Sequence, residues 1–191
     1  MSRYRTIPGF ILLPPPKGKQ ALGPRRIAYS SLYLALAILL PIVFHQFGIA
    51  GRIFLPMHIP VLICGFTVGP AAGVLIGLIA PFLSHLITGM PPAYAVPLMT
   101  MELPLYGLVA GLAYKKMKMN IYLALILAMI VGRLTFALGL LLLGMFIELP
   151  YGPLEFFAAG GAVVTGIPGI IIQIIVIPPL VAALKRSGNI S

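Results

Sequence analysis

The sequence predicts an all-α integral membrane protein: one compact bundle of six transmembrane helices, with both termini in the cytoplasm. The first observation is the composition. Of the 191 residues, 60% are hydrophobic and 8% are charged, and the mean hydropathy is +1.09. A soluble domain of this length cannot bury so much apolar surface. The second observation is a series of apolar runs close to the length of one spanning helix, about 20 residues.

The third observation is the placement of the 13 lysine and arginine residues, which give a net charge of +10. All of them except Arg52 and Arg133 lie within residues 1–26, 115–118 or 185–186. A six-span topology brings these three segments to the same side of the membrane, as the positive-inside rule requires. The charge therefore indicates membrane orientation. Nucleic-acid binding would need a basic face with aromatic side chains for stacking, so no nucleic-acid partner is expected.

Residues 1–24 are expected to form a basic cytoplasmic tail, because the apolar stretch FILLPPP is too short for the core of a signal peptide. Residues 25–186 are expected to form the transmembrane domain, and residues 187–191 a short cytoplasmic tail. Glycine, proline and basic residues divide the domain into six predicted spans. These spans are about 27–47, 57–69, 71–88, 95–114, 121–147 and 168–184.

The stretch FLPMHIPVLICGFTVGPAAGVLIG, residues 54–77, combines His58 with prolines and regularly spaced glycines. Its glycines, Gly65, Gly69, Gly73 and Gly77, have the small-xxx-small spacing that lets helix backbones approach closely. Pro70 predicts a break after Gly69 rather than one continuous helix. The series therefore indicates two tightly packed helices joined by a sharp turn.

Ionisable residues are rare inside the predicted spans, and each is a candidate for function. Such a group costs roughly 2.5–3.5 kcal/mol at the centre of a bilayer. Glu102 lies in the fourth predicted span, Arg133 near the middle of the fifth, and His58 at the start of the second. Tyr106 follows Glu102 by one turn on the same helix face. These residues predict a polar site open to the outside, although Glu102 and Arg133 could instead form only a structural ion pair.

Motifs of the common catalytic chemistries do not occur in the sequence. There is no G-x-x-x-x-G-K-[ST], H-E-x-x-H or G-x-S-x-G. The sequence therefore favours a binding component without enzymatic activity, and no metal or cofactor is expected. Two alternatives remain at this stage. One is a stand-alone secondary transporter driven by protons through Glu102, and the other is an intramembrane enzyme that uses His58, His85 and Glu102.

Three stretches carry a resemblance to a known family. HIPVLICGFTVGPAAGVLIGLIAPFLSHLITG, MELPLYGLVAGLAYKK and GIPGIIIQIIVIPPLVAALKR resemble the substrate-binding S components of energy-coupling-factor (ECF) vitamin transporters. The resemblance covers about residues 25–186. Its most specific parts are Gly65-Phe66 to Gly73 and Gly166 to Gly169 followed by Gln173. It implies a six-helix bundle in a prokaryotic plasma membrane, with an outward pocket for a vitamin-like micronutrient.

The resemblance also implies partners and further site residues. An S component works with a transmembrane T component and two ATPase subunits, and the family's docking motif corresponds to Ser31 and Ala35. Residues 52–59 would form a lid over the pocket, held extended by its prolines. Arg133 would suit a carboxylate or phosphate of the ligand. Further candidate contacts follow from the same resemblance: Arg52, Tyr151, Glu155 and Gln173.

Overall fold

The computed structural model describes residues 23–46, 51–147, 149 and 166–187, and within these ranges it contains helices and no strand. The elements are α1 (Pro24–Gln46), α2 (Gly51–Phe54), α3 (His58–Thr67), α4 (Pro70–Thr88), α5 (Ala95–Gly111), the π-helical segment η1 (Leu112–Lys116), α6 (Ile121–Leu143) and α9 (Ile167–Arg186). The predicted all-α class is therefore confirmed for the described part of the chain.

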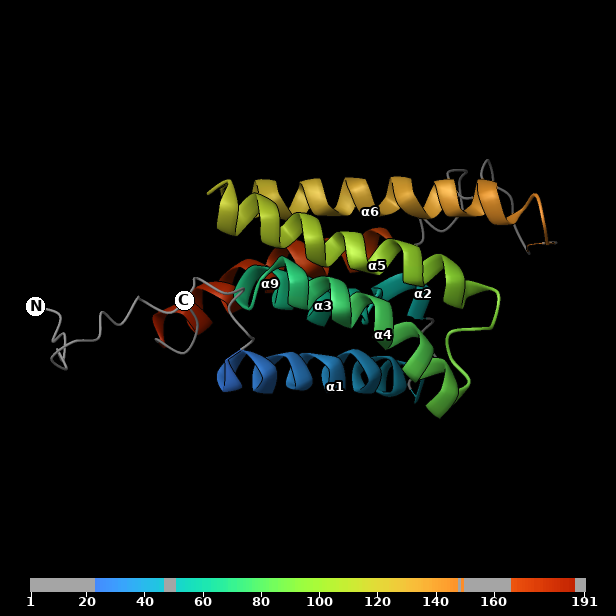
Figure 1. Ribbon diagram of the computed structural model, residues 1–191, viewed down its shortest axis with the longest axis horizontal. Coiled ribbons are helices and arrows are strands. Elements are labelled where there is room, and N and C mark those ends of the chain that lie inside the picture. Colours follow the sequence, from blue (N-terminus) through green and yellow to red (C-terminus); the bar gives the residue numbers. More distant parts are fainter. Residues whose placement is uncertain (1–22, 47–50, 148, 150–165, 188–191) are drawn as a thin grey trace, which may run out of the picture.

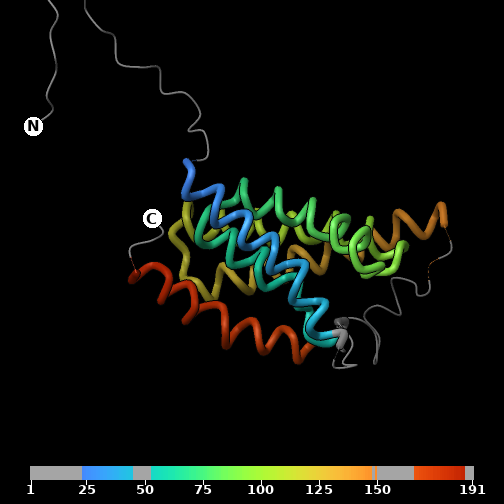
Figure 2. Tube along the Cα trace, turned by 90° about the horizontal axis from the view of Figure 1, so that it is seen from below, coloured from blue at the N-terminus to red at the C-terminus, as the bar shows by residue number. Residues whose placement is uncertain are grey.

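The long helices α1, α4, α5, α6 and α9 run side by side along the longest axis of the molecule, with the shorter α3 among them (Figure 1). α3 packs against α1, α4, α5 and α9, and all of its residues except Ile59 are buried. The long helices expose many leucine and isoleucine side chains. Apolar outer faces of this kind suit contact with lipid rather than water. Figure 2 shows the start of α1 and the end of α9 at the same end of the molecule.

Five of the described helices are long and apolar enough to cross a membrane: Pro24–Phe44, Pro70–Thr88, Ala95–Lys116, Ile121–Leu143 and Ile167–Arg186. They fall within a few residues of five predicted spans, although α6 ends at Leu143 rather than near residue 147. The remaining predicted span, 57–69, is the ten-residue helix α3. At 1.5 Å per residue α3 is about 15 Å long, roughly half of the hydrocarbon thickness. Six crossings and cytoplasmic termini therefore remain predictions.

The predicted break between the second and third spans is confirmed at Gly69. Its backbone has φ of +134°, a conformation that residues with a side chain rarely adopt, and Pro70 is the first residue of α4. The amide N–H of Gly69 donates to the carbonyl of Cys64, 3.0 Å away, which closes the end of α3. The chain thus reverses within two residues, so α3 and α4 pack as an antiparallel pair.

The other glycines of this series make backbone contacts between helices. A Cβ atom added to Gly65 would lie 2.5 Å from the carbonyl oxygen of Gly107, and one added to Gly107 would lie 2.5 Å from the carbonyl carbon of Gly73. One added to Gly77 would lie 2.5 Å from the backbone nitrogen of Pro104. Any side chain at these positions would force α3, α4 and α5 apart. The close packing predicted from the glycine spacing is therefore confirmed.

The extended conformation predicted for residues 52–59 is wrong, whereas their role as a lid stays a prediction. The segment contains the short helix α2, a turn at Leu55 with φ of 49°, and the start of α3, where the His58 N–H donates to the Leu55 carbonyl. The physical reason lies on α9. Gly169 has no side chain, so the backbone of α2 packs directly against it, and an added Cβ would lie 2.6 Å from the Ile53 carbonyl oxygen. This contact stabilises a helical turn where the prolines alone suggested an extended strand.

Candidate functional site

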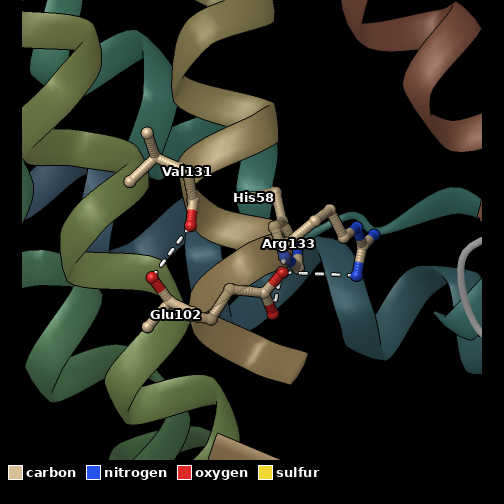
Figure 3. Close-up of polar contacts among 5 residues, drawn as sticks. His58, Glu102, Val131 and Arg133 are labelled. Carbon is tan, nitrogen blue, oxygen red and sulfur yellow. Dashed lines mark hydrogen bonds and ion pairs between the residues drawn. The ribbon is translucent and has the colours of Figure 1, made fainter. Parts of the chain in front are cut away.

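Three ionisable side chains from three helices meet in the interior of the bundle. Glu102 of α5 lies between His58, the first residue of α3, and Arg133 of α6 (Figure 3). Glu102 Oε2 is 3.5 Å from His58 Nε2, and Glu102 Oε1 is 3.2 Å from Arg133 Nη1. The exposed fraction of the side chain is 1% for Glu102, 3% for His58 and 12% for Arg133. The structure thus brings together the three ionisable residues that the sequence predicted inside the spans.

The short length of α3 places His58 at this depth. The helix begins at His58 and ends beside the Gly69 turn, where α4 also begins. A helix about 15 Å long, starting from one end of the bundle, reaches about half-way through a hydrocarbon layer of roughly 30 Å. His58 therefore opens α3 near the middle of the molecule, level with interior positions of α5 and α6 rather than at a membrane surface.

The ion pair between Glu102 and Arg133 explains how the charges are tolerated. A buried carboxylate is costly unless it is paired, and here each of its oxygens faces a group that can carry positive charge. The ion pair considered from the sequence is therefore present. An ion pair of this kind also fits a binding site, because charged groups within membrane spans commonly mark the path of a substrate.

Tyr106 completes the cluster on α5. Its ring meets the ring of His58 edge to face, with centroids 4.9 Å apart and planes at 88°, and its exposed fraction is 1%. Gly132 of α6 makes room for it, because a Cβ atom there would collide with the Tyr106 ring. The sequence analysis missed Gly132. The only signal available was a glycine directly before Arg133 in an apolar span, a position where glycine has many possible roles.

The buried nitrogen atoms without a hydrogen-bond partner among the described residues include Nδ1 of His58 and Nε2 of Gln173. Gln173 lies on α9, one turn after the Gly169 contact with α2, and is 1% exposed. A buried polar group without a partner costs about 1–3 kcal/mol, so most such groups in folded proteins are satisfied. Both nitrogens are therefore suited to a ligand, and Gln173 remains a predicted contact.

The other predicted residues either lie away from the cluster or fall wholly or partly outside the described residues. The backbone of Arg52 lies in α2, but its side chain, like Tyr151 and Glu155, falls outside the described residues. Ser31 and Ala35 are exposed on α1, away from the cluster. His85 lies apart from the cluster as well, since its Nδ1 contacts the carbonyl oxygen of Pro91 at 2.8 Å, in the turn after α4.

The fold and the cluster define the class of protein. Several apolar spans around buried ionisable side chains make this a multi-pass membrane protein with the features of a transport component. Residues 25–181 match the family model described as ECF transporter, substrate-specific component, and the chain belongs to this family. This confirms the resemblance found in the sequence, and the family consists of transport components rather than enzymes. No curated protein and no solved structure matches the chain.

Proposed function

We propose that the protein binds a water-soluble vitamin or related micronutrient at the His58–Glu102–Arg133 cluster and imports it as part of an ATP-driven transporter. The observation that supports this most directly is the cluster itself. It is a buried set of three ionisable groups in a chain whose family recognises transported substrates. A purely structural bundle has little reason to retain such costly groups at this depth.

Each member of the cluster offers a distinct contact to a polar ligand. The planar guanidinium of Arg133 suits a carboxylate or phosphate, and the carboxylate of Glu102 accepts hydrogen bonds. His58 can donate or accept at Nδ1, and the Tyr106 ring supplies a flat apolar surface beside it. The amide of Gln173 can donate from Nε2. The set fits a compact heteroaromatic or amide-containing molecule with several polar groups.

The energy for uptake would come from partner proteins. The sequence has no P-loop motif of its own. Members of this family work with a transmembrane T component and two ATPase subunits, and Ser31 and Ala35 are the predicted docking positions on α1. Both are exposed on a long apolar helix and are small enough for close approach of a second helix.

The test begins with mass spectrometry of small molecules released from gently purified protein, followed by calorimetric titration of the compound found. One vitamin-like molecule per chain is expected. Glu102→Gln should then raise the Kd about tenfold or more, since a charge-assisted hydrogen bond contributes about 1.5–3 kcal/mol. Thr100→Val is the matched control, because Thr100 lies on the same helix and bonds only within it, to the Val96 carbonyl at 2.7 Å.

Two outcomes would contradict the proposal. An unchanged Kd in Glu102→Gln would show that the cluster is not part of the binding site. Uptake by the isolated chain in liposomes after a pH jump, lost in Glu102→Gln, would support a proton-coupled secondary transporter instead. Uptake that requires the T component, the ATPases and ATP is the result expected here.

A further inference from the structure

Cations from three elements gather at one end of the bundle, where α1 begins and where η1 and α9 end (Figure 1). Arg26 belongs to α1, Lys115 to η1 and Lys185 to α9. Arg26, Lys185 and Lys118 all lie within electrostatic range of the Lys115 ammonium group. Like charges at such separations repel one another, so an anion placed among them would relieve the repulsion.

Two of these ammonium groups are held in fixed positions. Nζ of Lys115, which is partly buried, donates to the carbonyl oxygen of Thr67 at 2.5 Å. Nζ of Lys185 lies 4.2 Å from the centroid of the Tyr114 ring, a cation–π contact. Long cationic side chains normally lose much conformational freedom when they bind a ligand. Here part of that loss has already occurred, so the two cations are prepared to bind an anion.

The acidic side chain of the described residues lies away from these cations. Among the residues that the structure describes, Glu102 is the only acidic one, and it belongs to the buried cluster. Glu102 precedes Lys115 by 13 residues along α5 and η1, which corresponds to about 20 Å of helix. Within the described part of the chain, acidic side chains therefore contribute little negative charge near the cations.

Exposed apolar side chains lie close to the cations along the same helices. Ile27 directly follows Arg26 and is 53% exposed, and Leu180 precedes Lys185 on α9 and is 41% exposed. Apolar helices that end in basic residues place those residues at the depth of the lipid headgroups. The surface thus offers a phosphate-binding end beside hydrocarbon-binding flanks, which fits an amphiphile better than a free inorganic anion.

We propose that Arg26, Lys115 and Lys185 bind the phosphate of an anionic phospholipid, in the leaflet that contacts this end of the bundle. The headgroup has to carry a net negative charge, because the choline of a zwitterionic lipid would bring a further cation to the cluster. The acyl chains then lie against exposed apolar side chains of α1 and α9. This inference depends on the chain's place in a membrane and not on the identity of the transported compound.

Native mass spectrometry of the full chain, released from nanodiscs of phosphatidylcholine and phosphatidylglycerol, tests the proposal. The wild type should retain one phosphatidylglycerol. K115Q/K185Q should lower the retained fraction about tenfold, since it removes two charge-assisted contacts with the phosphate. R25Q/K116Q removes the same amount of charge from exposed side chains of α1 and η1 that lie outside the proposed phosphate site, and should change the fraction less than about twofold because exposed charges are screened by salt. K115R/K185R should retain the lipid.

Loss of the Lys115 contact with Thr67 could also disturb folding, so a second variant is needed. R26Q leaves the ammonium groups of Lys115 and Lys185 in place and should still lower the retained fraction of phosphatidylglycerol about threefold. Equal losses in R25Q/K116Q and K115Q/K185Q would overturn the proposal, because they would show a general charge effect. Release of phosphatidylglycerol by millimolar inorganic phosphate would overturn it in favour of a free-anion site. A wild type that retains no anionic lipid would also overturn it.

Discussion

Glu102 is the residue on which the candidate site depends. It is almost fully buried, and its carboxylate contacts groups from two other helices, His58 and Arg133. Removal of one partner leaves an uncompensated charge in the interior, whereas replacement of both charges by uncharged side chains of similar size is often neutral. The structural and ligand-binding roles of the pair can therefore be separated by experiment.

Arg133→Met should lower the free energy of unfolding by about 3 kcal/mol, because Glu102 would stay buried without its ion pair. For a chain of this size that corresponds to a fall of roughly 6–12 °C in Tm. The measurement can use Cys64, the single cysteine of the chain, which is buried and becomes reactive to a thiol-specific fluorophore on unfolding.

The double variant E102Q/R133M serves as the control for that prediction. It should recover most of the lost stability, because no uncompensated charge remains. It should still fail to bind the ligand, since the polar contacts are gone. A double variant that binds the ligand as well as the wild type would show that the ion pair is only structural.

For single residues, the sequence predicted the roles of the charged side chains but not the role of Gly132. His58, Glu102 and Arg133 were predicted because an ionisable group inside an apolar span needs a specific reason. Their mutual contact required the three-dimensional arrangement, since they come from three separate helices. The role of Gly132 depends on the position of the Tyr106 ring, which no local pattern in the sequence encodes.

Among the elements, α3 determines how the site is built. It is too short to cross a membrane alone, it is buried along nearly its whole length, and it carries His58 at its first position. Its end is fixed by the Gly69 turn and by the Lys115 contact with Thr67. The position of His58 therefore depends on close packing of α3 against α4 and α5, which the glycines permit.

Gly107→Ala should disrupt this packing. Its new methyl group would meet the backbone of Gly73 at 2.5 Å, and a backbone cannot move aside as a flexible side chain can. Overpacking of this kind costs about 1–3 kcal/mol or more, so Tm by Cys64 labelling should fall by at least roughly 2 °C. Gly139→Ala is the control, because its methyl group would meet the movable ends of the Leu98 and Met101 side chains, at 3.1 Å and 3.5 Å, and no backbone atom. Equal Tm values for the two variants would contradict the packing argument.

The long helices and the position of α3 were predictable, whereas α2 and η1 were not. Runs of about 20 apolar residues bounded by proline, glycine or lysine define α1, α4, α5, α6 and α9 closely. The single turn of α2 forms because Gly169 of α9 lets its backbone dock, which is a tertiary effect. The π-helical segment η1 also lacks a local signature, because LAYKK equally fits an α-helix.

For the molecule as a whole, the exposed face of α1 is where the coupling partner is expected. Ser31 and Ala35 lie one turn apart and are both exposed. Their small side chains would let a helix of the T component approach closely. This face is well separated in the fold from the buried cluster, so binding of the ligand and docking of the partner can be tested independently.

S31L/A35L should abolish ATP-driven uptake and leave the ligand Kd unchanged within about twofold, since the bulky side chains would block only helix docking. Uptake by proteoliposomes that contain the T component and ATPases, with calorimetry on the isolated chain, gives both values. Val43→Phe, exposed on the same helix but about two turns beyond Ala35 and turned about 80° from it, should leave uptake normal. Normal uptake by S31L/A35L would place the docking surface elsewhere.

The half-length of α3 also has an electrical consequence. A ligand that enters from the membrane side opposite the Gly69 turn and binds beside His58 travels through about half of the transmembrane voltage. A full crossing changes the energy of one elementary charge by about 2.3 kcal/mol per 100 mV, so half of it amounts to about 1.2 kcal/mol. For a singly charged ligand this equals roughly a sevenfold change in affinity. A binding constant measured in detergent, without a membrane voltage, would then differ from the one that operates in an energised cell.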